Sequence, residues 1–167
     1  EVTSAATADN VAPVVGYTTT TTLIKVAETL LDKPGGYLSN DALPPSVFLD
    51  NMPAWEFGVL EMVRDMALIM RKDLSRSQSQ SLANKHIKVA QPKFNIDNRS
   101  WAMPSAESEY RQAISSLYSY RNALVGISKA KNDNAQFYAR ADNLASYFEE
   151  VQKRLGGYSQ RLSASVG

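Results

Sequence analysis

The sequence predicts an all-α protein: an elongated helical bundle with an antiparallel pair of long heptad helices and long packed connections. Two apolar repeats carry this prediction, because residues that recur at alternating steps of three and four lie on one face of a helix. The repeats fall in residues 105–131 and 134–165. A short polar turn separates them, and such a turn is typical of antiparallel neighbouring helices.

The composition is that of one globular domain. The chain has 167 residues, of which 44% are hydrophobic and 21% are charged, as in ordinary folded proteins. No apolar run is long enough to cross a bilayer. We expect a flexible tail over residues 1–16 and a single all-helical domain over residues 17–167. Because the chain begins with Glu1, we also expect it to be a piece of a longer protein.

The first two helices are predicted at residues 18–33 and 54–77. A run of threonines at 18–22 precedes the first apolar stripe, and we expect one of them to cap the helix. The sequence Pro34-Gly35-Gly36 then ends it. The stripe of the second helix consists of Trp55, Val59, Met62, Met66 and Ile69. Its methionines are expected in the core, although methionine stripes can also mark an adaptable binding groove.

Two stretches, 37–53 and 86–101, interrupt the helical pattern. Both contain prolines and turn residues together with apolar side chains that need burial. We expect residues 37–53 to lie packed across the helices. The alternation of Ile87 and Val89 is compatible with a small β-ribbon. We prefer extended chain packed on the bundle for residues 86–101.

The last two helices carry the clearest stripes. Ser105 is predicted to cap the helix at 105–131, with Glu107 in the first turn, where the helix dipole favours a carboxylate. The stripe of this helix is Tyr110, Ala113, Leu117, Tyr120, Leu124 and Ile127. That of the helix at 134–165 is Phe137, Ala141, Leu144, Phe148, Val151, Leu155, Tyr158 and Leu162. A seam of this length can also be buried against a second chain.

The absence of several residue types excludes several chemistries. The sequence contains no Cys and one His, which excludes a thiolate nucleophile and any zinc site built on cysteines or on several histidines of this chain. We therefore expect no cofactor, no metal site and no catalytic residue. His86 lies among lysines without a nucleophile motif, and we expect it to be exposed to solvent. The sequence leaves enzymatic activity undecided and favours a non-enzymatic role.

Positive charge is concentrated in residues 71–99, which hold seven basic and two acidic residues in a chain of net charge +1. The usual explanation is a solvated helix end and loop. The alternative is contact with an anionic surface. The residues for that contact are Arg71, Lys72, Arg76, Lys85 and Lys88. Nucleic acid is not expected as a partner, because no aromatic residues are interleaved with these charges.

Two irregular segments each place a tryptophan beside acidic or amide side chains. Such a segment can be pinned to a bundle by its aromatic ring, with its polar groups satisfied by hydrogen bonds. It can also form a saccharide site, where paired carboxylates serve as acid and base. The candidate ligand-binding residues are Asp50, Trp55, Glu56, Asp97, Arg99, Trp101 and Glu107.

Several unusual motifs resemble those of one known family. They are GGYLSND at 35–41, PP at 44–45 leading into LDNMPAWE at 49–56, SRSQSQS at 75–81, FNID at 94–97 leading into SWAMPSAESEY at 100–110, and RLSASVG at 161–167. Over residues 17–167 the chain resembles the bacterial domain of unknown function 2333 family. This resemblance carries no assigned activity.

The resemblance implies a Gram-negative envelope protein in the periplasm, tethered to the inner membrane by a segment that this chain lacks. It also implies that part of the family's N-terminal half is missing here. Together with the long apolar seams, it predicts a helical module for protein–protein interaction or scaffolding, with a protein partner or by self-association. The alternative is binding or hydrolysis of cell-wall glycan next to Trp55 and Trp101.

Overall fold

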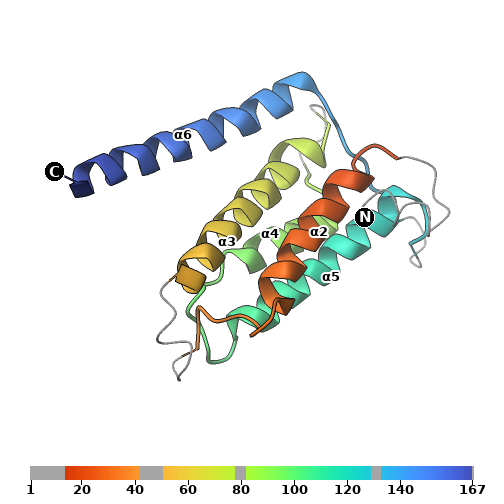
Figure 1. Ribbon diagram of the computed structural model, residues 1–167. Coiled ribbons are helices and arrows are strands. Elements are labelled where there is room, and N and C mark those ends of the chain that lie inside the picture. The colour runs from red at the N-terminus through yellow and green to blue at the C-terminus, as the bar shows by residue number, and fades with distance from the viewer. Residues whose placement is uncertain (1–13, 42–50, 78–81, 129–132, 167) are drawn as a thin grey trace.

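The computed structural model describes residues 14–41, 51–77, 82–128 and 133–166. Within these ranges the regular structure is entirely helical, which confirms the predicted all-α class (Figure 1). The elements are α2 (Tyr17–Asp32), α3 (Asn51–Ile69), the π-helical turn η2 (Met70–Leu74), α4 (Lys85–Phe94), α5 (Ala106–Leu124) and α6 (Ala141–Val166). Most of the predicted tail, Asp50 and the end of the Ser/Gln stretch lie outside the described residues.

Four helices, α2, α3, α4 and α5, surround one apolar core. α5 packs against α4 and α2, and α3 packs against α2 and α4. The centre of the core is aromatic: the Tyr110 ring stacks on Phe94 at 6.2 Å and meets the edge of Tyr37 at 5.8 Å between centroids. The large side chains buried around it include Ile24, Leu30, Leu60, Met70, Leu74, Ile87, Leu117 and Tyr120.

The predicted antiparallel pairing of the last two helices is not confirmed. The apolar stripe of α5 is buried against α4 and α2, whereas α6 contacts α3. The third helix ends at Leu124 instead of 131, because the chain turns through Gly126 at a φ of +74°. The fourth helix begins at Ala141 instead of 134. Residues 133–140 run as irregular chain, and Tyr138 N donates to Leu74 O at 2.8 Å.

The preference for extended chain over residues 86–101 is wrong for its first half, which forms α4. Asn84 caps this helix, because its side chain accepts a hydrogen bond from His86 N at 2.9 Å. Its buried residues are Ile87, Ala90, Gln91 and Phe94, which follow the helical steps of three and four. Val89 is 47% exposed, so its alternation with Ile87 does not mark a strand face.

The predicted threonine cap of the first helix is also wrong. The N-cap residue is Gly16, at a φ of +88°, and no side chain caps the N-terminus of α2. The threonines stand inside α2, and two of them return hydrogen bonds to the preceding turn. The Thr20 hydroxyl donates to Gly16 O at 2.8 Å, and the Thr22 hydroxyl donates to Thr18 O at 2.9 Å. These bonds satisfy hydroxyls that would otherwise compete with the helix.

The predicted end of the first helix and the predicted cap of the third agree with the structure. α2 ends directly before Lys33 and the Pro34-Gly35-Gly36 sequence. Ser105 caps α5, and its hydroxyl accepts a hydrogen bond from Ser108 N at 3.3 Å. The second helix, predicted at 54–77, instead begins at Asn51 and, with its π-helical turn, ends at Leu74.

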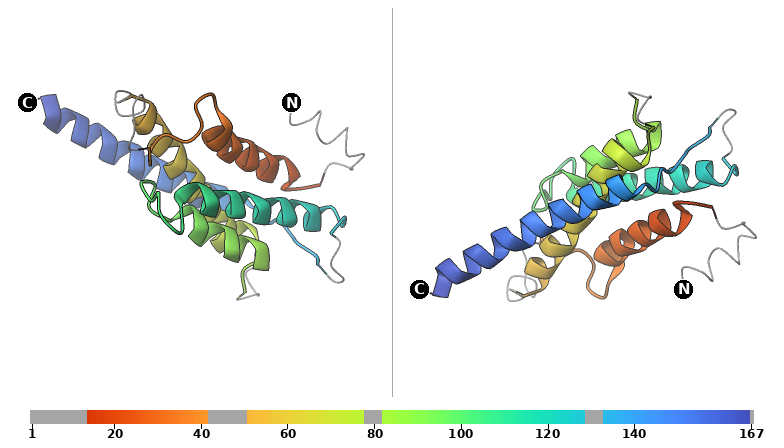
Figure 2. Two further views of the ribbon diagram at one scale, coloured as in Figure 1. Left: turned by 90° about the horizontal axis from the view of Figure 1, so that it is seen from below. Right: turned by 90° about the horizontal axis from the view of Figure 1, so that it is seen from above.

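The last helix, α6, lies outside the four-helix core. It crosses α3, and its C-terminal end projects beyond the bundle in every view (Figures 1 and 2). Asn143 anchors its first turn, because its amide donates to Asp73 O at 3.1 Å and to Tyr138 O at 3.0 Å. Within the described ranges, no helix has the length and apolar character needed to span a membrane.

Candidate functional site

The predicted seam of the last helix is largely exposed to solvent. We call Leu144, Phe148, Leu155, Tyr158 and Leu162 the α6 apolar face. The exposed fractions of these residues range from 40% for Tyr158 to 68% for Leu162. Scattered exposed apolar residues are normal, but a continuous row of large ones along a helix is typical of an interaction site. The α6 apolar face is therefore the first candidate site.

A cluster of charged groups attaches α6 to α3 along the flank next to the α6 apolar face. The Arg154 guanidinium donates to Glu61 Oε2 and Asp65 Oδ1 on α3, both at 2.5 Å. Glu61 also accepts from Arg64 at 2.9 Å, and Arg64 in turn donates to the carbonyl oxygens of Phe94 and Ile96. This cluster joins α6 to the core through a polar flank, so the α6 apolar face stays free.

Sequence motifs alone do not reveal this cluster, although one signal is present. Glu61 and Asp65 stand four residues apart, which places two carboxylates on the same face of a helix. Their partner is distant in sequence and belongs to a helix with no predicted contact to α3.

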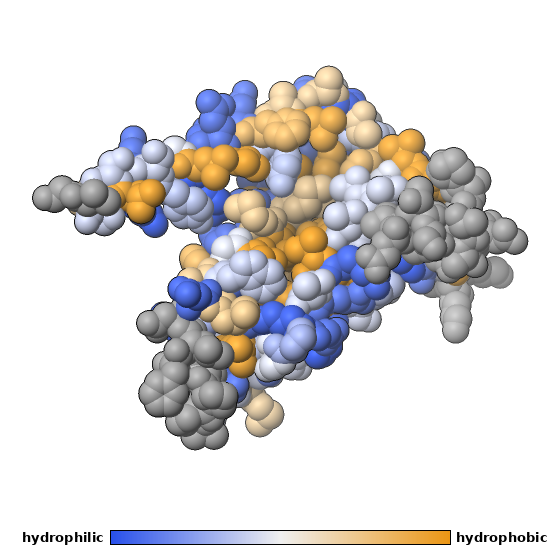
Figure 3. Space-filling model, viewed as in Figure 1, coloured by the Kyte–Doolittle hydropathy of each residue, from blue (hydrophilic) through white to orange (hydrophobic). Residues whose placement is uncertain are grey.

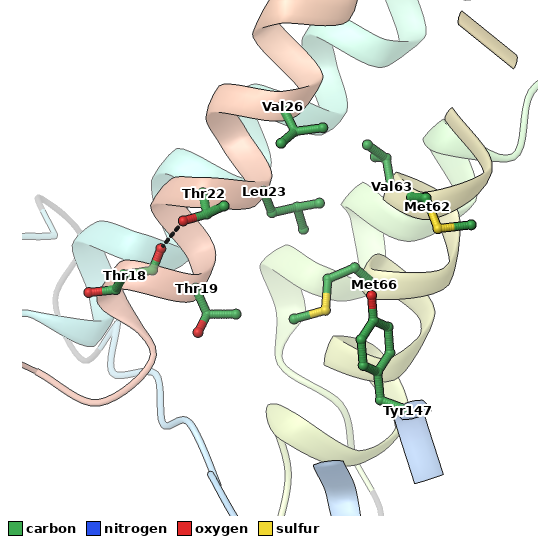
Figure 4. A pocket seen from close by; sticks show the side chains of 9 residues that line it. All are labelled: Thr18, Thr19, Thr22, Leu23, Val26, Met62, Val63, Met66 and Tyr147. Carbon is green, nitrogen blue, oxygen red and sulfur yellow. Dashed lines mark hydrogen bonds between the residues drawn. The ribbon is translucent and has the colours of Figure 1, made fainter. Parts of the chain in front are cut away.

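An apolar hollow of about 380 Å³ lies between α2, α3 and the start of α6. Its lining consists of Thr18, Thr19, Thr22, Leu23, Val26, Met62, Val63, Met66 and Tyr147 (Figure 4). Figure 3 shows apolar residues gathered on this side of the molecule, beneath the overhanging helix. The Tyr147 ring lies 5.8 Å from that of Phe148. The hollow therefore borders the α6 apolar face.

Burial and the nearby Asp65 carboxylate raise the pKa of Tyr147 above its ordinary value. A tyrosine hydroxyl is neutral at physiological pH even at its ordinary pKa, so Tyr147 adds no charge to the hollow. Met62 and Met66 line the hollow and are half-buried, so the methionine stripe belongs partly to the core and partly to this surface.

Glu56, one of the predicted ligand residues, is completely buried and occupied by protein donors. Its Oε1 accepts from Leu38 N at 2.8 Å and from the Lys33 ammonium. Its Oε2 accepts from Ser39 N at 2.7 Å and from the Ser39 hydroxyl at 2.5 Å. In this arrangement the carboxylate holds the chain after α2 against the start of α3, and neither oxygen faces solvent.

The two tryptophan segments come together through the chain after α2. The Tyr37 hydroxyl donates to Asn98 O at 3.0 Å, and the Asn40 amide donates to Ser100 O at 3.2 Å. The end of α2 and the starts of α3 and α5 lie at the same end of the bundle (Figure 1). Trp55 is 45% exposed and Trp101 is 77% exposed.

The remaining predicted ligand residues are more accessible. Asp97 and Arg99 are exposed in one turn, in which Asp97 Oδ1 accepts from Arg99 N at 3.0 Å. Glu107 is half-buried in the first turn of α5. Ligand binding by these residues stays a prediction, and Asp50 lies outside the described residues.

The predicted basic surface is divided between internal and exposed roles. Arg71 donates to Gln91 Oε1 at 2.6 Å, and Lys85 pairs with Asp133 at 2.8 Å. Lys85 is itself exposed, as are Lys72, Arg76 and Lys88. Contact with an anionic surface stays a prediction for these residues.

His86 is not on the open surface, contrary to expectation. It is half-buried, and its Nε2 lies 3.0 Å from both carboxylate oxygens of Asp133. The Ser128 hydroxyl donates to Asp133 Oδ2 at 2.6 Å. A nucleophile–base pair requires a hydroxyl bonded to the imidazole. Here the serine and the histidine both contact the carboxylate, so the cluster fastens the chain after α5 to the start of α4.

Asp133 is expected to make stability depend on acid pH. Hydrogen bonds from Lys85, then Ser128, hold the pKa of this buried carboxyl well below its usual range. The unfolded chain binds the proton near pH ~4, whereas the folded protein binds it only at lower pH. This stabilisation is therefore complete above about pH 4 and is lost as the pH falls below it.

Chemical denaturation of Asp133→Asn across pH 2–7 tests this expectation. The difference in free energy of unfolding between the parent and the variant should be largest above pH 5 and shrink on acidification. Asp142→Asn, at an exposed carboxyl of α6, is the control and should leave the pH profile unchanged. A constant difference for Asp133→Asn at all pH values would contradict the assignment.

Within the described ranges, no group of three or more acidic or histidine side chains is placed to hold a metal ion. A family model described as "Uncharacterized protein conserved in bacteria (DUF2333)" matches residues 1–167. The match includes the 16 N-terminal residues that the sequence resemblance did not cover. No curated protein and no solved structure matches the chain.

Proposed function

We propose that this chain, which belongs to the DUF2333 family of uncharacterised bacterial proteins, is a protein-interaction module that binds through the α6 apolar face. The observation that carries the proposal is the exposure of large apolar side chains along a helix that overhangs its own core. Burying such a row on a partner removes apolar area from water, which is the dominant favourable term in protein association.

The arrangement of the helix supports the same function. α6 is fixed to α3 by Arg154 and to η2 by Asn143, so a partner does not need to order a free segment before binding. The hollow beside Tyr147 provides a recess in which an anchor side chain of a partner can be enclosed.

We place this module in the bacterial envelope, as the family resemblance implies, with its tether outside the present chain. Scaffolding of an envelope assembly is the role that best fits a rigid bundle with one projecting helix.

Photocrosslinking in cells tests the proposed function. A photoreactive phenylalanine analogue at Phe148 or Leu155 should give covalent protein adducts. The same analogue at Glu149 or Lys153, which point away from the α6 apolar face, should give far fewer. Absence of adducts at Phe148 and Leu155, or equal yields at all four positions, would overturn the proposal.

The polar double variant Phe148→Ser, Leu155→Ser separates binding from folding. Both side chains are more than half exposed, so the free energy of unfolding should change by less than about 1 kcal/mol. Partner adducts trapped from Leu144 should nevertheless fall at least tenfold. Glu149→Ser, Gln160→Ser is the matched control and should retain them. Unfolding of the first variant, measured by circular dichroism, would show that the row is part of the core.

Saccharide binding is the second candidate, favoured by the exposure of Trp55 and Trp101 at one end of the bundle. Binding is favoured over hydrolysis because the Glu56 carboxylate is buried and fully hydrogen-bonded. Cell-wall glycan fragments should change the tryptophan emission of the parent, and Trp101→Ala should weaken the response. Unchanged emission at saturating glycan would reject this candidate.

A further inference from the structure

We propose that the α6 apolar face pairs with the same face of a second copy of this chain, with the two α6 helices antiparallel. This inference rests on the proposed function, because it takes the α6 apolar face as a contact surface and names its occupant. Three features of α6 support the pairing independently of the proposed function. They are the symmetric order of its apolar side chains, the distribution of charge along the helix and the open flank opposite to α3.

The apolar positions of α6 are symmetric about Lys153. Val151 and Leu155 stand two residues from it, Phe148 and Tyr158 stand five, and Leu144 and Leu162 stand nine. Two antiparallel copies aligned at Lys153 bring together the members of each pair. Aliphatic residues then meet aliphatic residues and the two aromatic residues meet each other. A single register thus buries every apolar layer of both helices.

The charge distribution favours the antiparallel orientation. Before Lys153, α6 carries Asp142, Glu149 and Glu150, whereas after it the helix carries Arg154 and Arg161. Arg154 is already paired with α3, and Lys153, at the centre of the register, pairs with Glu150 of its own helix at 3.1 Å. Arg161 therefore remains as the positive charge that the acidic half of a second copy meets. Antiparallel pairing places the acidic half of one helix along the basic half of the other, and parallel pairing places like charges together. The helix dipoles also oppose in this orientation.

The flank opposite to α3 leaves room for a second helix. Ala145, Gln152 and Ser159 follow one another at steps of seven along this flank, and all three are exposed. They are uncharged, so a second helix can approach without removing a charged group from water. The C-terminal end of α6 projects past the bundle, which leaves space there for the first turns of a partner helix (Figure 2).

Thiol crosslinking of the intact 167-residue chain tests the orientation. The sequence has no cysteine, so Leu144→Cys and Leu162→Cys each introduce a single thiol. In the antiparallel register the two copies of residue 144 lie about 27 Å apart, since they are 18 positions apart at ~1.5 Å per residue. A short bismaleimide should therefore crosslink an equilibrated mixture of the two variants, and each variant alone should give little product.

Matched controls make the result specific. Ser146→Cys and Gln160→Cys stand seven residues on either side of Lys153 on the opposite face, and their mixture should not crosslink. Leu155→Asp should shift the sedimentation coefficient from that of a dimer to that of a monomer, while the circular dichroism spectrum is kept. An unchanged sedimentation coefficient for Leu155→Asp would overturn the inference.

The other outcomes distinguish this inference from the proposed function. Efficient crosslinking of each single variant alone would show parallel pairing and overturn the inference. A monomer at all concentrations, together with cellular adducts to a different protein at Phe148, would also overturn it and would leave the proposed function standing. Loss of all cellular adducts would overturn both.

Discussion

Glu56→Ala is expected to lower the free energy of unfolding by about 3–5 kcal/mol, as is typical when one partner of a buried ion pair is removed. The Glu56 carboxylate is fully buried and receives hydrogen bonds from Lys33, Leu38 and Ser39. Alanine would leave the 9%-exposed Lys33 ammonium without its counter-charge and two backbone N–H groups without an acceptor. The effect is measured as the change in free energy of unfolding in urea.

Asp32→Ala provides the matched control. The ion pair of Asp32 with Arg111 has a similar length, 2.9 Å, but both side chains are more than half exposed. Exposed pairs of this kind contribute about 0–1 kcal/mol, so this variant should be nearly as stable as the parent. Equal losses for Glu56→Ala and Asp32→Ala would show that the buried network around Glu56 does not stabilise the chain after α2.

The network around Glu56 shows where sequence reasoning reaches its limit. The sequence predicted a special role for this carboxylate, because it stands beside Trp55 at the start of a helix. Its partners lie 17 to 23 residues earlier, in a turn whose path depends on the packing of α2 against α3. A carboxylate pattern alone cannot distinguish a buried, hydrogen-bonded anchor from a ligand group.

Helix periodicity predicts which segments are helical better than it predicts which helices pack against each other. The stripes of α5 and α6 are predictable because apolar residues recur regularly on one face of each helix. Such a stripe indicates that another element covers the face, and it does not identify that element. In the structure α4 covers α5, and the predicted pairing with α6 is not confirmed. α4 itself was missed because Pro92 and a local alternation of apolar residues suggested extended chain, whereas burial of Ile87 and Phe94 stabilises a short helix.

The sequence predicts the residues of the α6 apolar face as a seam. It does not predict that this seam is exposed to solvent. A heptad pattern indicates which residues share a face, and tertiary packing decides whether that face meets its own bundle. Here Arg154 turns the flank next to the α6 apolar face toward α3. This orientation depends on carboxylates of α3, which the sequence of α6 does not reveal. The candidate site was therefore predictable as a set of residues, and its availability to a partner required the structure.

Gly16→Ala is expected to lower the free energy of unfolding by about 2–5 kcal/mol, from two separate causes. The φ of Gly16 is +88°, and a side chain in the left-handed region costs roughly 1–2 kcal/mol. An added Cβ would also overlap the ring of Phe137, which packs directly on this glycine. Relieving that overlap requires displacement of Phe137, and overpacking of this kind costs about 1–3 kcal/mol.

Gly126→Ala separates the two causes. Gly126 also has a positive φ, +74°, but open space surrounds the position of its missing Cβ. This control should show only the backbone cost, about 1–2 kcal/mol, so Gly16→Ala should be the less stable variant in urea denaturation. Adding Phe137→Gly to Gly16→Ala removes both the ring and the Cβ that would overlap, and the two single losses should then sum to more than the loss in the double variant. Strictly additive losses would mean that the Phe137 ring moves aside freely, and that Gly16 is required only for the left-handed turn that starts α2.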